Sequence, residues 1–336
     1  MSVVNTYKSL DSFVRLEKAF KKELGQVEEY LIQIIKDQPQ WFQEVVSHLI
    51  QAGGKRIRPL LVFLSYSLVS ETKINKDAVI MAALSEFVHT ATLFHDDVID
   101  EGQERRGKPT VNKMYGNHTA ILGGDFILGK VFQELNRLNK PEVLSEMIDT
   151  VAKLVEGEIY QMDIKRKPSV TFENYERLIY LKTASLFEWC MVAGGCAADK
   201  DKEITILLKK MGNHIGRIFQ IVDDILDYTG SNILGKKRLQ DFYQGKITLP
   251  LLFLFNIENS YFTQWKNLVN NKDETGLEIM RKEFTERIKK SDIQAEMKFY
   301  LQKDINSIQE IIQQLPKSSY HEHINSLISF LVSRMM

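Results

Sequence analysis

The 336-residue chain is predicted to be all-α, a single large helical domain around a central cavity. Apolar residues recur at three- and four-residue steps, and strand-like alternation of apolar and polar residues persists nowhere. No linker, low-complexity tract or composition shift divides the chain. We therefore expect one domain over residues 1–336, with a motif-bearing core at about 50–255 and C-terminal helices at 256–336.

Two helices are clearest, because their apolar residues keep the helical spacing without interruption. One carries Leu84, Phe87, Val88, Ala91, His95 and Val98, and the other carries Ile215, Ile218, Phe219, Val222 and Leu226. Glycine, proline and short polar pairs break the pattern and predict helix ends. These breaks are Gly53-Gly54, Gly102, Gly107 with Pro109, Asn139 to Pro141, Lys167-Pro168, Ser231-Asn232 and Pro316.

Composition argues against several classes of protein. Lys+Arg and Asp+Glu both number 44, so the zero net charge does not favour a nucleic-acid partner. Cys190 and Cys196 lie in an apolar segment without C-x-x-C spacing, which indicates reduced, buried thiols. The N-terminus lacks the apolar region of a signal peptide, and no apolar run approaches the ~20 residues that span a bilayer. We expect a cytoplasmic protein without a transmembrane segment.

The strongest functional signal is an Asp-Asp-x-x-Asp motif that occurs twice, at residues 96–100 and 223–227. In each copy the first and last aspartates lie four residues apart and share one helical face. An isolated acidic cluster is usually a solvated surface, but both copies lie in apolar sequence. Two such clusters across a cavity could hold several Mg²⁺ ions, and Mg²⁺ commonly binds diphosphates in proteins. The candidate metal ligands are Asp96, Asp97, Asp100, Asp223, Asp224 and Asp227.

Basic and polar residues near the two motifs are candidate phosphate ligands. A loop with glycine and proline follows the first motif and carries Arg105 and Arg106, and guanidinium groups bind phosphate oxygens in pairs. Residues 53–59, Gly-Gly-Lys-Arg-Ile-Arg-Pro, precede a helix and suit an anion, with ordinary surface charge as the alternative. The other candidates are Lys55, Arg58, His89, Lys182, Thr183, Gln220, Lys236 and Lys246.

The motifs of nucleophilic and nucleotide chemistry are absent from the sequence. It has no Gly-x-Ser-x-Gly, no His-Glu-x-x-His, no Walker loop and no Gly-x-Gly-x-x-Gly. Six carboxylates with Lys and Arg nearby can instead bind two diphosphates, one through metal ions and one directly. Because Mg²⁺ stabilises a departing diphosphate, such a site is suited to ionising a carbon–oxygen bond.

In order and spacing these motifs resemble those of the trans (all-E) polyprenyl diphosphate synthases, which belong to the farnesyl diphosphate synthase superfamily. The resemblance covers roughly residues 50 to 255. Its segments are 53–59, 89–100, 105–110, Gly-Asp-Phe at 124–126, Glu-Gly-Glu at 156–158, Lys-Thr-Ala-Ser-Leu-Phe at 182–187, 219–227 and Gly-Lys-Ile-Thr-Leu-Pro-Leu at 245–251. The chain departs from the pattern at Leu239 and Gln244, where the family usually has Gly and Glu.

The resemblance implies an isoprenoid synthase fold and a role for each matched residue. Two or three Mg²⁺ ions would be bound by Asp96, Asp100 and Asp223, with support from Asp97, Asp224 and Asp227. The allylic diphosphate would contact Arg105, Lys182, Thr183, Gln220, Lys236 and Lys246. Isopentenyl diphosphate would be bound by Lys55, Arg58, His89 and Arg106. Catalysis would depend mainly on Asp96, Asp100, Asp223, Lys182 and Arg105.

The family reaction ionises the allylic diphosphate, adds an isopentenyl unit and releases a proton. Short-chain members often have Phe or Tyr four or five residues before the first motif, where this chain has Thr92 and Ala91. These small residues imply a long all-trans product, hexaprenyl to decaprenyl, suited to a quinone side chain. The tunnel is expected to continue past Phe126, Ile127 and Val131.

Three alternatives stay open: a geranylgeranyl diphosphate synthase, a class I terpene cyclase and a catalytic subunit of a heteromeric prenyl synthase. A cyclase would not need the isopentenyl-binding set Lys55, Arg58 and Arg106. Non-catalytic subunits typically lose the aspartates, and both motifs are intact here. Family analogy implies a homodimer.

Overall fold

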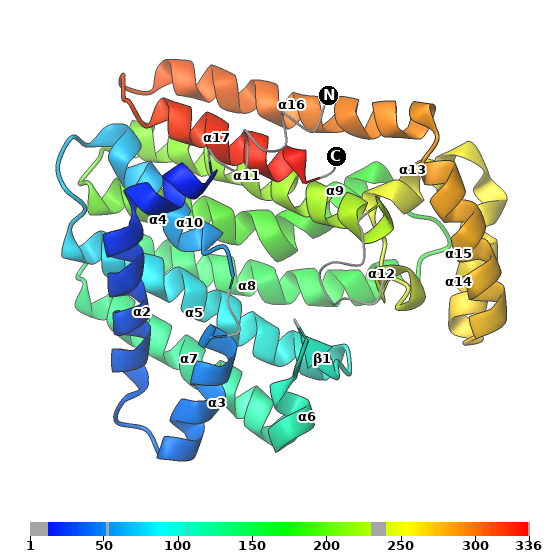
Figure 1. The fold of residues 1–336 in the computed structure, drawn as a ribbon, viewed down its shortest axis with the longest axis horizontal. Helices are drawn as coiled ribbons and strands as arrows, with labels where there is room; N and C mark the ends of the chain where they lie inside the picture. The colour runs from blue at the N-terminus through cyan, green and yellow to red at the C-terminus, as the bar shows by residue number, and fades with distance from the viewer. Residues whose placement is uncertain (1–12, 52–53, 106, 230–239, 335–336) are drawn as a thin grey trace.

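The computed structural model describes residues 13–51, 54–105, 107–229 and 240–334, and these are almost entirely helical (Figure 1). The prediction of an all-α fold is confirmed. Residues 13–19 are helical, and after them come α2 (Lys21–Ile35), α3 (Gln40–Gln51), α4 (Ile57–Val69), α5 (Lys76–Ile99), α6 (Val111–Tyr115), α7 (Asn117–Arg137), α8 (Pro141–Ile164), α9 (Phe172–Ile179), η1 (Tyr180–Ala184), α10 (Ser185–Ala197), α11 (Lys202–Thr229), α12 (Gln240–Tyr243), α13 (Leu249–Ile257), α14 (Asn259–Asn270), α15 (Glu274–Ile288), α16 (Ser291–Gln314) and α17 (His321–Ser333).

Most of the helix breaks expected from the sequence coincide with helix ends. α5 ends at Ile99, shortly before Gly102, and α16 ends at Gln314, before Pro316. α8 begins at Pro141, a favourable first position because the missing N–H has no helical partner there. The break expected at Ser231-Asn232 lies outside the described residues.

One two-stranded ribbon interrupts the helices directly after α5. Strands β1 (Glu104–Arg105) and β2 (Lys108–Pro109) are antiparallel, with Glu104 opposite Pro109 and Arg105 opposite Lys108. The ribbon is anchored by Thr110, whose backbone N–H donates to Gln103 O and whose hydroxyl donates to Gly102 O. It therefore holds Arg105 close to the end of α5.

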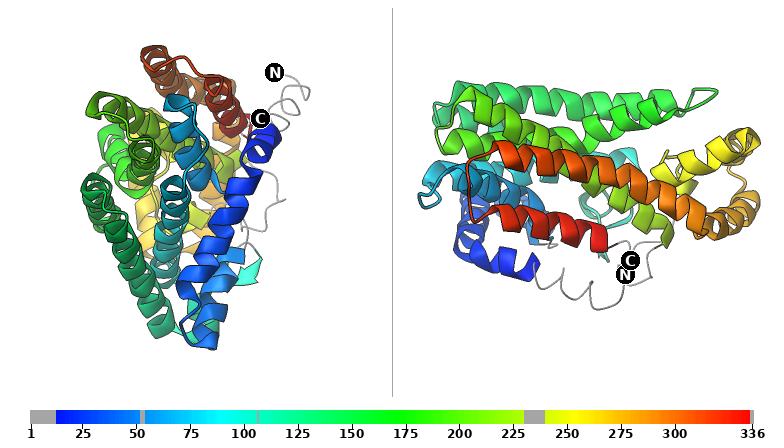
Figure 2. Two further views of the ribbon diagram at one scale, coloured as in Figure 1. Left: turned by 90° about the vertical axis from the view of Figure 1, so that its left-hand side faces the viewer. Right: turned by 90° about the horizontal axis from the view of Figure 1, so that it is seen from above.

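The core is built around α4, α5 and α10, whose apolar residues occupy every side of the helix rather than one stripe. In α4 every residue from Pro59 to Val69 is buried, and in α10 almost every residue is. Helices that are apolar all round belong in the interior of a protein. Figure 1 shows α16 and α17 along one side of this core and α7 along the other, with α13, α14 and α15 at one end; Figure 2 shows the same arrangement from two further directions.

Among the described residues, α5 is long and apolar enough to cross a membrane by length and composition alone. It thus exceeds the length that we expected of any apolar segment. However, 78% of its most apolar 18-residue window is buried inside the protein, against α2, α4, α7 and α10. Its apolar character is therefore accounted for by the core.

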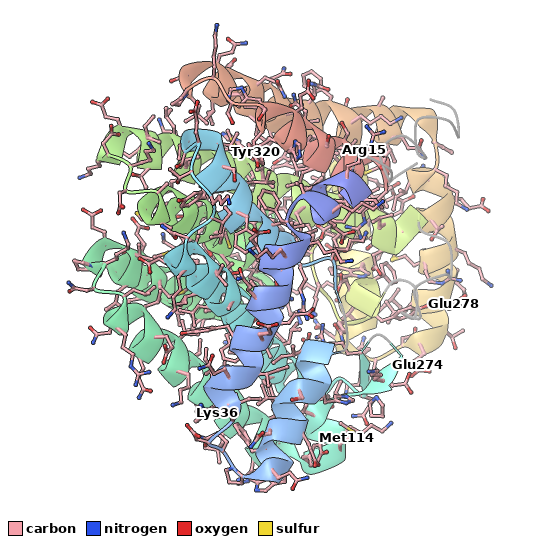
Figure 3. All side chains as sticks on the ribbon, turned by 60° about the vertical axis from the view of Figure 1, so that its left-hand side comes forward. Arg15, Lys36, Met114, Glu274, Glu278 and Tyr320 are labelled. Atoms are coloured by element: carbon pink, nitrogen blue, oxygen red, sulfur yellow. The ribbon has the colours of Figure 1, made fainter. Side chains whose placement is uncertain are left out.

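The start and the end of the described chain pack against each other. Phe13 stacks on Phe330 of α17 with ring centroids 4.0 Å apart, and Phe20 lies 5.9 Å from Tyr320. Figure 3 shows Arg15 and Tyr320 on this side of the molecule. α17 also packs on α4 and α11, and its Phe330 lies beside Lys55, which follows Gly54.

Candidate active site

The first acidic motif lies at the C-terminal end of α5, where Asp96 and Asp100 share one face of the helix. Asp100 caps the helix, and its backbone N–H donates to Asp96 O. Asp96 borders a cavity of about 250 Å³ together with His95, Glu158 of α8 and Lys182 of η1. The helical spacing thus places the first and last aspartates of the motif on one face of α5, as predicted, and Asp96 faces a cavity.

Asp96 lies in a crowded acidic environment. Burial and the nearby carboxylates of Glu158 and Asp100 raise the pKa of Asp96 to about 7. Carboxylate oxygens are the donors that a hard divalent cation prefers, and a cation would relieve this repulsion. The donor set therefore fits Mg²⁺. Within the described residues, no three His, Cys, Asp or Glu side chains converge closely enough to hold an ion in this arrangement.

Asp97 points away from the cavity and binds Arg105. The Arg105 Nη2 donates to Asp97 Oδ1 at 2.8 Å, and its Nε donates to the same carboxylate at 3.1 and 3.3 Å. The Asp97 side chain is buried, so this paired geometry is well shielded from water. Asp97 thus fixes the arginine that the resemblance assigns to the allylic diphosphate.

Asp100 is linked to the segment that follows α12. The Lys246 Nζ donates to Asp100 Oδ2 at 2.7 Å and lies 3.7 Å from Asp241 Oδ1. Lys246 lies three residues before the start of α13 and directly follows Gly245, which has a left-handed conformation with φ of +71°. The structure therefore brings Lys246 to the first motif, although it is 146 residues away in sequence.

The second acidic motif lies on α11, and its three aspartates have different surroundings. Asp223 is half-buried, with an oxygen 3.8 Å from Arg334 Nη2. Asp224 is buried and accepts hydrogen bonds from Tyr175 Oη at 2.7 Å, Gln220 Nε2 at 2.8 Å and the Leu249 backbone N–H at 3.2 Å. Burial raises the pKa of Asp224 to about 8. Asp227 follows one helical turn after Asp223 and is half-buried.

Lys182, Thr183 and Gln220 come together where η1 meets α8 and α11. The Lys182 Nζ lies 2.5 Å from Glu158 Oε1 and donates to Gln161 Oε1 at 3.0 Å. The Thr183 hydroxyl donates to Gln220 Oε1 at 2.7 Å. The structure thus brings together two segments singled out in the sequence: Lys182 borders the cavity beside Asp96, and Gln220 bonds both Thr183 and Asp224.

The residues expected to bind isopentenyl diphosphate lie partly near the chain ends. Lys55 Nζ sits 4.4 Å from the ring centroid of Phe330, and burial together with Arg334 lowers the pKa of Lys55 to about 8. The Arg58 guanidinium lies 5.4 Å from the Phe187 ring, and His89 is half-buried on α5. The remaining residues expected in the site, Arg106 and Lys236, lie outside the described residues, as does Leu239.

Below Asp96 the cavity becomes apolar. Its walls come from α5, α7 and α8 and consist of Val88, Thr92, Ile99, Leu128, Val151, Leu154 and Val155. Thr92 lines the cavity as expected, but Ala91 is fully buried and does not. The α7 residue on the wall is Leu128, whereas Ile127 and Val131 are buried in the core and Phe126 packs edge-on against Phe42. Most of the cavity wall is thus apolar, and Asp96, Glu158 and Lys182 are the carboxylates and the ammonium group on it.

Comparison with known proteins decides the family. A family model described as polyprenyl synthetase matches residues 39–286. The chain belongs to the polyprenyl synthetase family. Octaprenyl diphosphate synthase of Escherichia coli is 37% identical over 243 residues, which cover 71% of this chain and 73% of that protein. Heptaprenyl diphosphate synthase component 2 of Bacillus subtilis is 34% identical over 302 residues, or 88% of this chain and 85% of that protein.

Solved structures show the same architecture over nearly the whole polyprenyl synthetase chain. A polyprenyl synthase from Caulobacter crescentus, complexed with calcium and isoprenyl diphosphate, has a TM-score of 0.87 at 28% identity, covering 96% of this chain and 98% of that one. Heptaprenyl diphosphate synthase from Staphylococcus aureus has a TM-score of 0.87 at 31% identity, covering 94% and 99%. The expected isoprenoid synthase fold is therefore confirmed.

Three residues of this polyprenyl synthetase site were not singled out individually by their sequence pattern. Glu158 and Gln161 both contact Lys182, and Arg334 lies beside Asp223. Glu158 stands in a matched segment, Glu-Gly-Glu at 156–158, and this was the available signal. Gln161 and Arg334 belong to no matched segment, so only the tertiary structure reveals their positions.

Proposed function

We propose that this polyprenyl synthetase condenses isopentenyl diphosphate with an allylic diphosphate, such as farnesyl diphosphate, and builds a long all-trans polyprenyl diphosphate. The supporting observation is the cavity, whose polar end holds Asp96, Glu158 and Lys182 and whose apolar walls extend away from them. A diphosphate fits the polar end, and a growing hydrocarbon fits the apolar end. Relatives named octaprenyl, nonaprenyl and heptaprenyl diphosphate synthases favour a long product, suited to a quinone side chain.

The proposed enzyme is Mg²⁺-dependent and uses two or three ions. Asp96, Asp100 and Asp223 would hold them, with Asp97, Asp224 and Asp227 in support, and the related structure with calcium and isoprenyl diphosphate is consistent with a cation and diphosphate at such a site. When bound, the ions neutralise the departing diphosphate as Lewis acids. Glu158 would add a further carboxylate at the same end of the cavity.

The residues of the chain divide into two diphosphate sites in this proposal. Arg105, held by Asp97, would orient the allylic diphosphate from one side. Its other ligands would be Lys182, Thr183, Gln220, Lys236 and Lys246. Lys55, Arg58, His89 and Arg106 would hold isopentenyl diphosphate. The allylic carbon–oxygen bond would ionise first, and the diphosphate would leave with the bonding electrons. The isopentenyl double bond would then attack the allylic carbocation, and the resulting cation would lose a proton to the released diphosphate. The apolar walls would exclude water from the allylic carbocation, because water would react with it and form an alcohol.

We also propose that the enzyme is a cytoplasmic homodimer that associates through α8. Ile148, Val155, Ile159 and Met162 are 51%, 55%, 63% and 46% exposed and form one stripe along this helix. An antiparallel second copy of α8 would place this apolar stripe against the same stripe of its partner, which is the self-complementary contact that a twofold interface requires.

A second candidate, the catalytic subunit of a heteromeric synthase, is favoured by the relative named component 2. Both candidate functions can be tested with one assay. It uses the purified chain alone with Mg²⁺, labelled isopentenyl diphosphate and farnesyl diphosphate. Long-chain product from a species of twice the monomer mass supports the homodimeric synthase. Product that stops at twenty carbons indicates a geranylgeranyl diphosphate synthase. A folded chain without product contradicts the proposed function in its stand-alone form.

A further inference from the structure

The segment that carries Lys182 and Thr183 is a π-helical turn, η1, inserted between α9 and α10. Single π-helical turns are rare and occur often at functional sites, because the extra residue changes where the side chains of the turn point. Leu181, Thr183 and Ala184 are buried, so the turn is enclosed by other elements rather than exposed. The residues that pack against this turn therefore determine the position of the Lys182 ammonium group.

Two glycines allow neighbouring helices to approach the turn on either side. A Cβ on Gly157 of α8 would lie 2.7 Å from Lys182 Cγ and 3.2 Å from the Lys182 backbone nitrogen. A Cβ on Gly216 of α11 would lie 2.6 Å from Ala184 Cα. Any side chain at either position would therefore push the turn away. At Gly157 the displaced atoms would be those of Lys182 together with Leu181 Cβ, which would lie 3.1 Å away.

The end of the Lys182 side chain is held by α8 as well. Gln161 Oε1 accepts a hydrogen bond from Lys182 Nζ at 3.0 Å, and Glu158 lies on the other side of the same ammonium group at 2.5 Å. Gln161 lies one helical turn after Glu158 and is only 9% exposed. The neutral Gln161 amide therefore constrains the direction of the Lys182 ammonium group and adds no second negative charge beside the proposed diphosphate.

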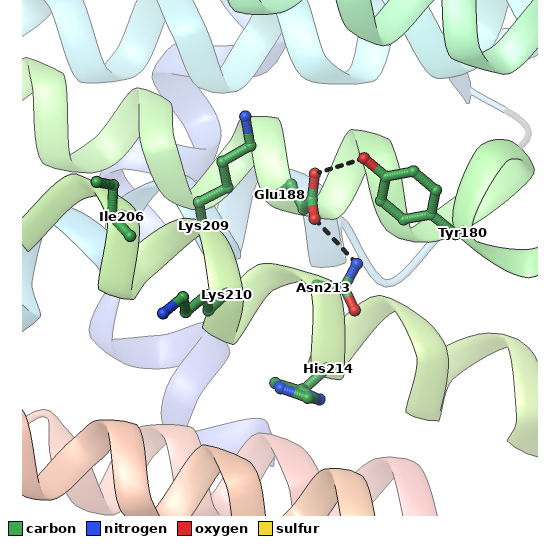
Figure 4. Close-up of a pocket in the computed structure, with 7 residues that line it drawn as sticks. All are labelled: Tyr180, Glu188, Ile206, Lys209, Lys210, Asn213 and His214. Carbon is green, nitrogen blue, oxygen red and sulfur yellow. Dashed lines mark hydrogen bonds between the residues drawn. The ribbon is translucent and has the colours of Figure 1, made fainter. Parts of the chain in front are cut away.

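The back of the turn is fixed by a separate hydrogen-bonded group. Glu188 accepts from Asn213 Nδ2 at 2.9 Å and from Tyr180 Oη at 3.4 Å, so α10 and α11 are joined to the first residue of η1 (Figure 4). These residues border a second cavity of about 280 Å³ on the far side of the turn. Glu188 and its partners therefore fix one side of the π-helical turn, and α8 fixes the side that faces the cavity beside Asp96.

We propose that Gly157 and Gln161 are positioning residues for the reaction: Gly157 lets α8 seat the π-helical turn, and Gln161 fixes the direction of the Lys182 ammonium group. This inference rests on the proposed function, in which Lys182 binds the allylic diphosphate as it departs. In this proposal neither residue binds the substrate directly. Both act through Lys182.

A double-mutant cycle tests the inference, with Gly157→Ala and Gln161→Leu each made in the wild-type and the Lys182→Ala backgrounds. In the wild-type background each should lower kcat for the allylic diphosphate by about ten- to a hundredfold, because small displacements of a catalytic group have effects of this size. The KM for isopentenyl diphosphate should change by less than about twofold. In the Lys182→Ala background neither should cause further loss, because the group that they position is gone.

Gly25→Ala is the matched control, since Gly25 is an exposed helical glycine with no atom near an added Cβ. If Gly157→Ala does not fold, as judged by circular dichroism and thermal unfolding, Gln161→Leu carries the test. Losses that stay the same in the Lys182→Ala background would show a merely structural role and overturn the inference. Unchanged kcat in Gly157→Ala or Gln161→Leu, with an active wild type, would overturn it as well. An inactive wild type contradicts the stand-alone form of the proposed function instead.

Discussion

The two acidic motifs have the same sequence pattern but are connected to different parts of the protein. At the first motif, Asp97 binds Arg105 and Asp100 binds Lys246, so its aspartates are tied to cations proposed to contact substrate. At the second motif, Asp224 is tied to Tyr175 and to the Leu249 backbone in the interior. The middle aspartate of each motif is buried and bonded to other protein groups, while Asp96 borders the cavity and Asp223 is half-buried, so we propose that the first aspartates bind the metal and the middle ones hold the site in place.

Removal of the metal should reduce product formation more than any substitution, because it affects both acidic motifs at once. Excess EDTA should reduce product formation to background, because the carboxylates around Asp96 repel a diphosphate unless cations neutralise them. Added Mg²⁺ should restore activity, measured with labelled isopentenyl diphosphate. Undiminished turnover in chelator would contradict a metal role for either motif.

Substitution of the first aspartates tests whether both motifs act on the departing diphosphate. Asp96→Ala and Asp223→Ala should each lower kcat by about a hundred- to a thousandfold, because each removes stabilisation of the leaving group. Steady-state kinetics with both substrates would measure this. A loss confined to Asp96→Ala would show that the second motif has another task.

The middle aspartates should separate stability from activity. Asp224→Ala removes a buried acceptor of three hydrogen bonds and should lower the free energy of unfolding by about 1–3 kcal/mol. Asp97→Ala should destabilise the protein less and raise the KM for the allylic diphosphate, because Arg105 loses its anchor. Urea denaturation and kinetics on the same preparations measure both effects. The reverse pattern would show that Asp224 serves the chemistry directly.

The apolar side of the first motif sets the expected product length. Thr92→Phe should shorten the product by several isoprene units, because a ring would fill the wall of the 250 Å³ cavity. Ala91→Phe is a contrasting control: Ala91 is buried outside that wall, so the ring should lower the melting temperature instead. Chromatography of the dephosphorylated products gives the chain lengths. An unchanged product from folded Thr92→Phe would disprove the assignment of this wall.

The smallest expected effect concerns pH and the cation near the second motif. Because the pKa of Lys55 is lowered to about 8, the free enzyme holds Lys55 charged below this pH and loses the charge above it. The kcat/KM for isopentenyl diphosphate should therefore fall above about pH 8, by roughly tenfold per pH unit if this charge is essential. Lys55→Arg stays charged and should remove that fall. A wild-type profile that is flat to pH 10 would exclude this role.

The helical class and the location of the motifs could be predicted from the sequence because both depend on local periodicity. The buried positions of Asp97 and Asp224 were not predicted, because a 100° step around a helix does not say which side the rest of the protein covers. For the same reason the sequence treated Thr92 and Ala91 alike, and only the structure places Thr92 on the cavity wall and Ala91 in the core. The Asp100–Lys246 pair and the contacts of Gln161 could not be predicted, because they depend on how distant helices pack. The π-helical turn also lacks a local signal, since its backbone is set by its neighbours.

Val155 and Ile99 line the cavity while remaining 55% and 46% exposed, so in places a single side chain separates the interior hydrocarbon path from the outside. In the proposed homodimer, a second copy over α8 would cover these side chains and keep water from the cavity at this point, and its departure would open an exit for a product that water does not dissolve. Dilution that separates the subunits should then release shorter, prematurely shed chains.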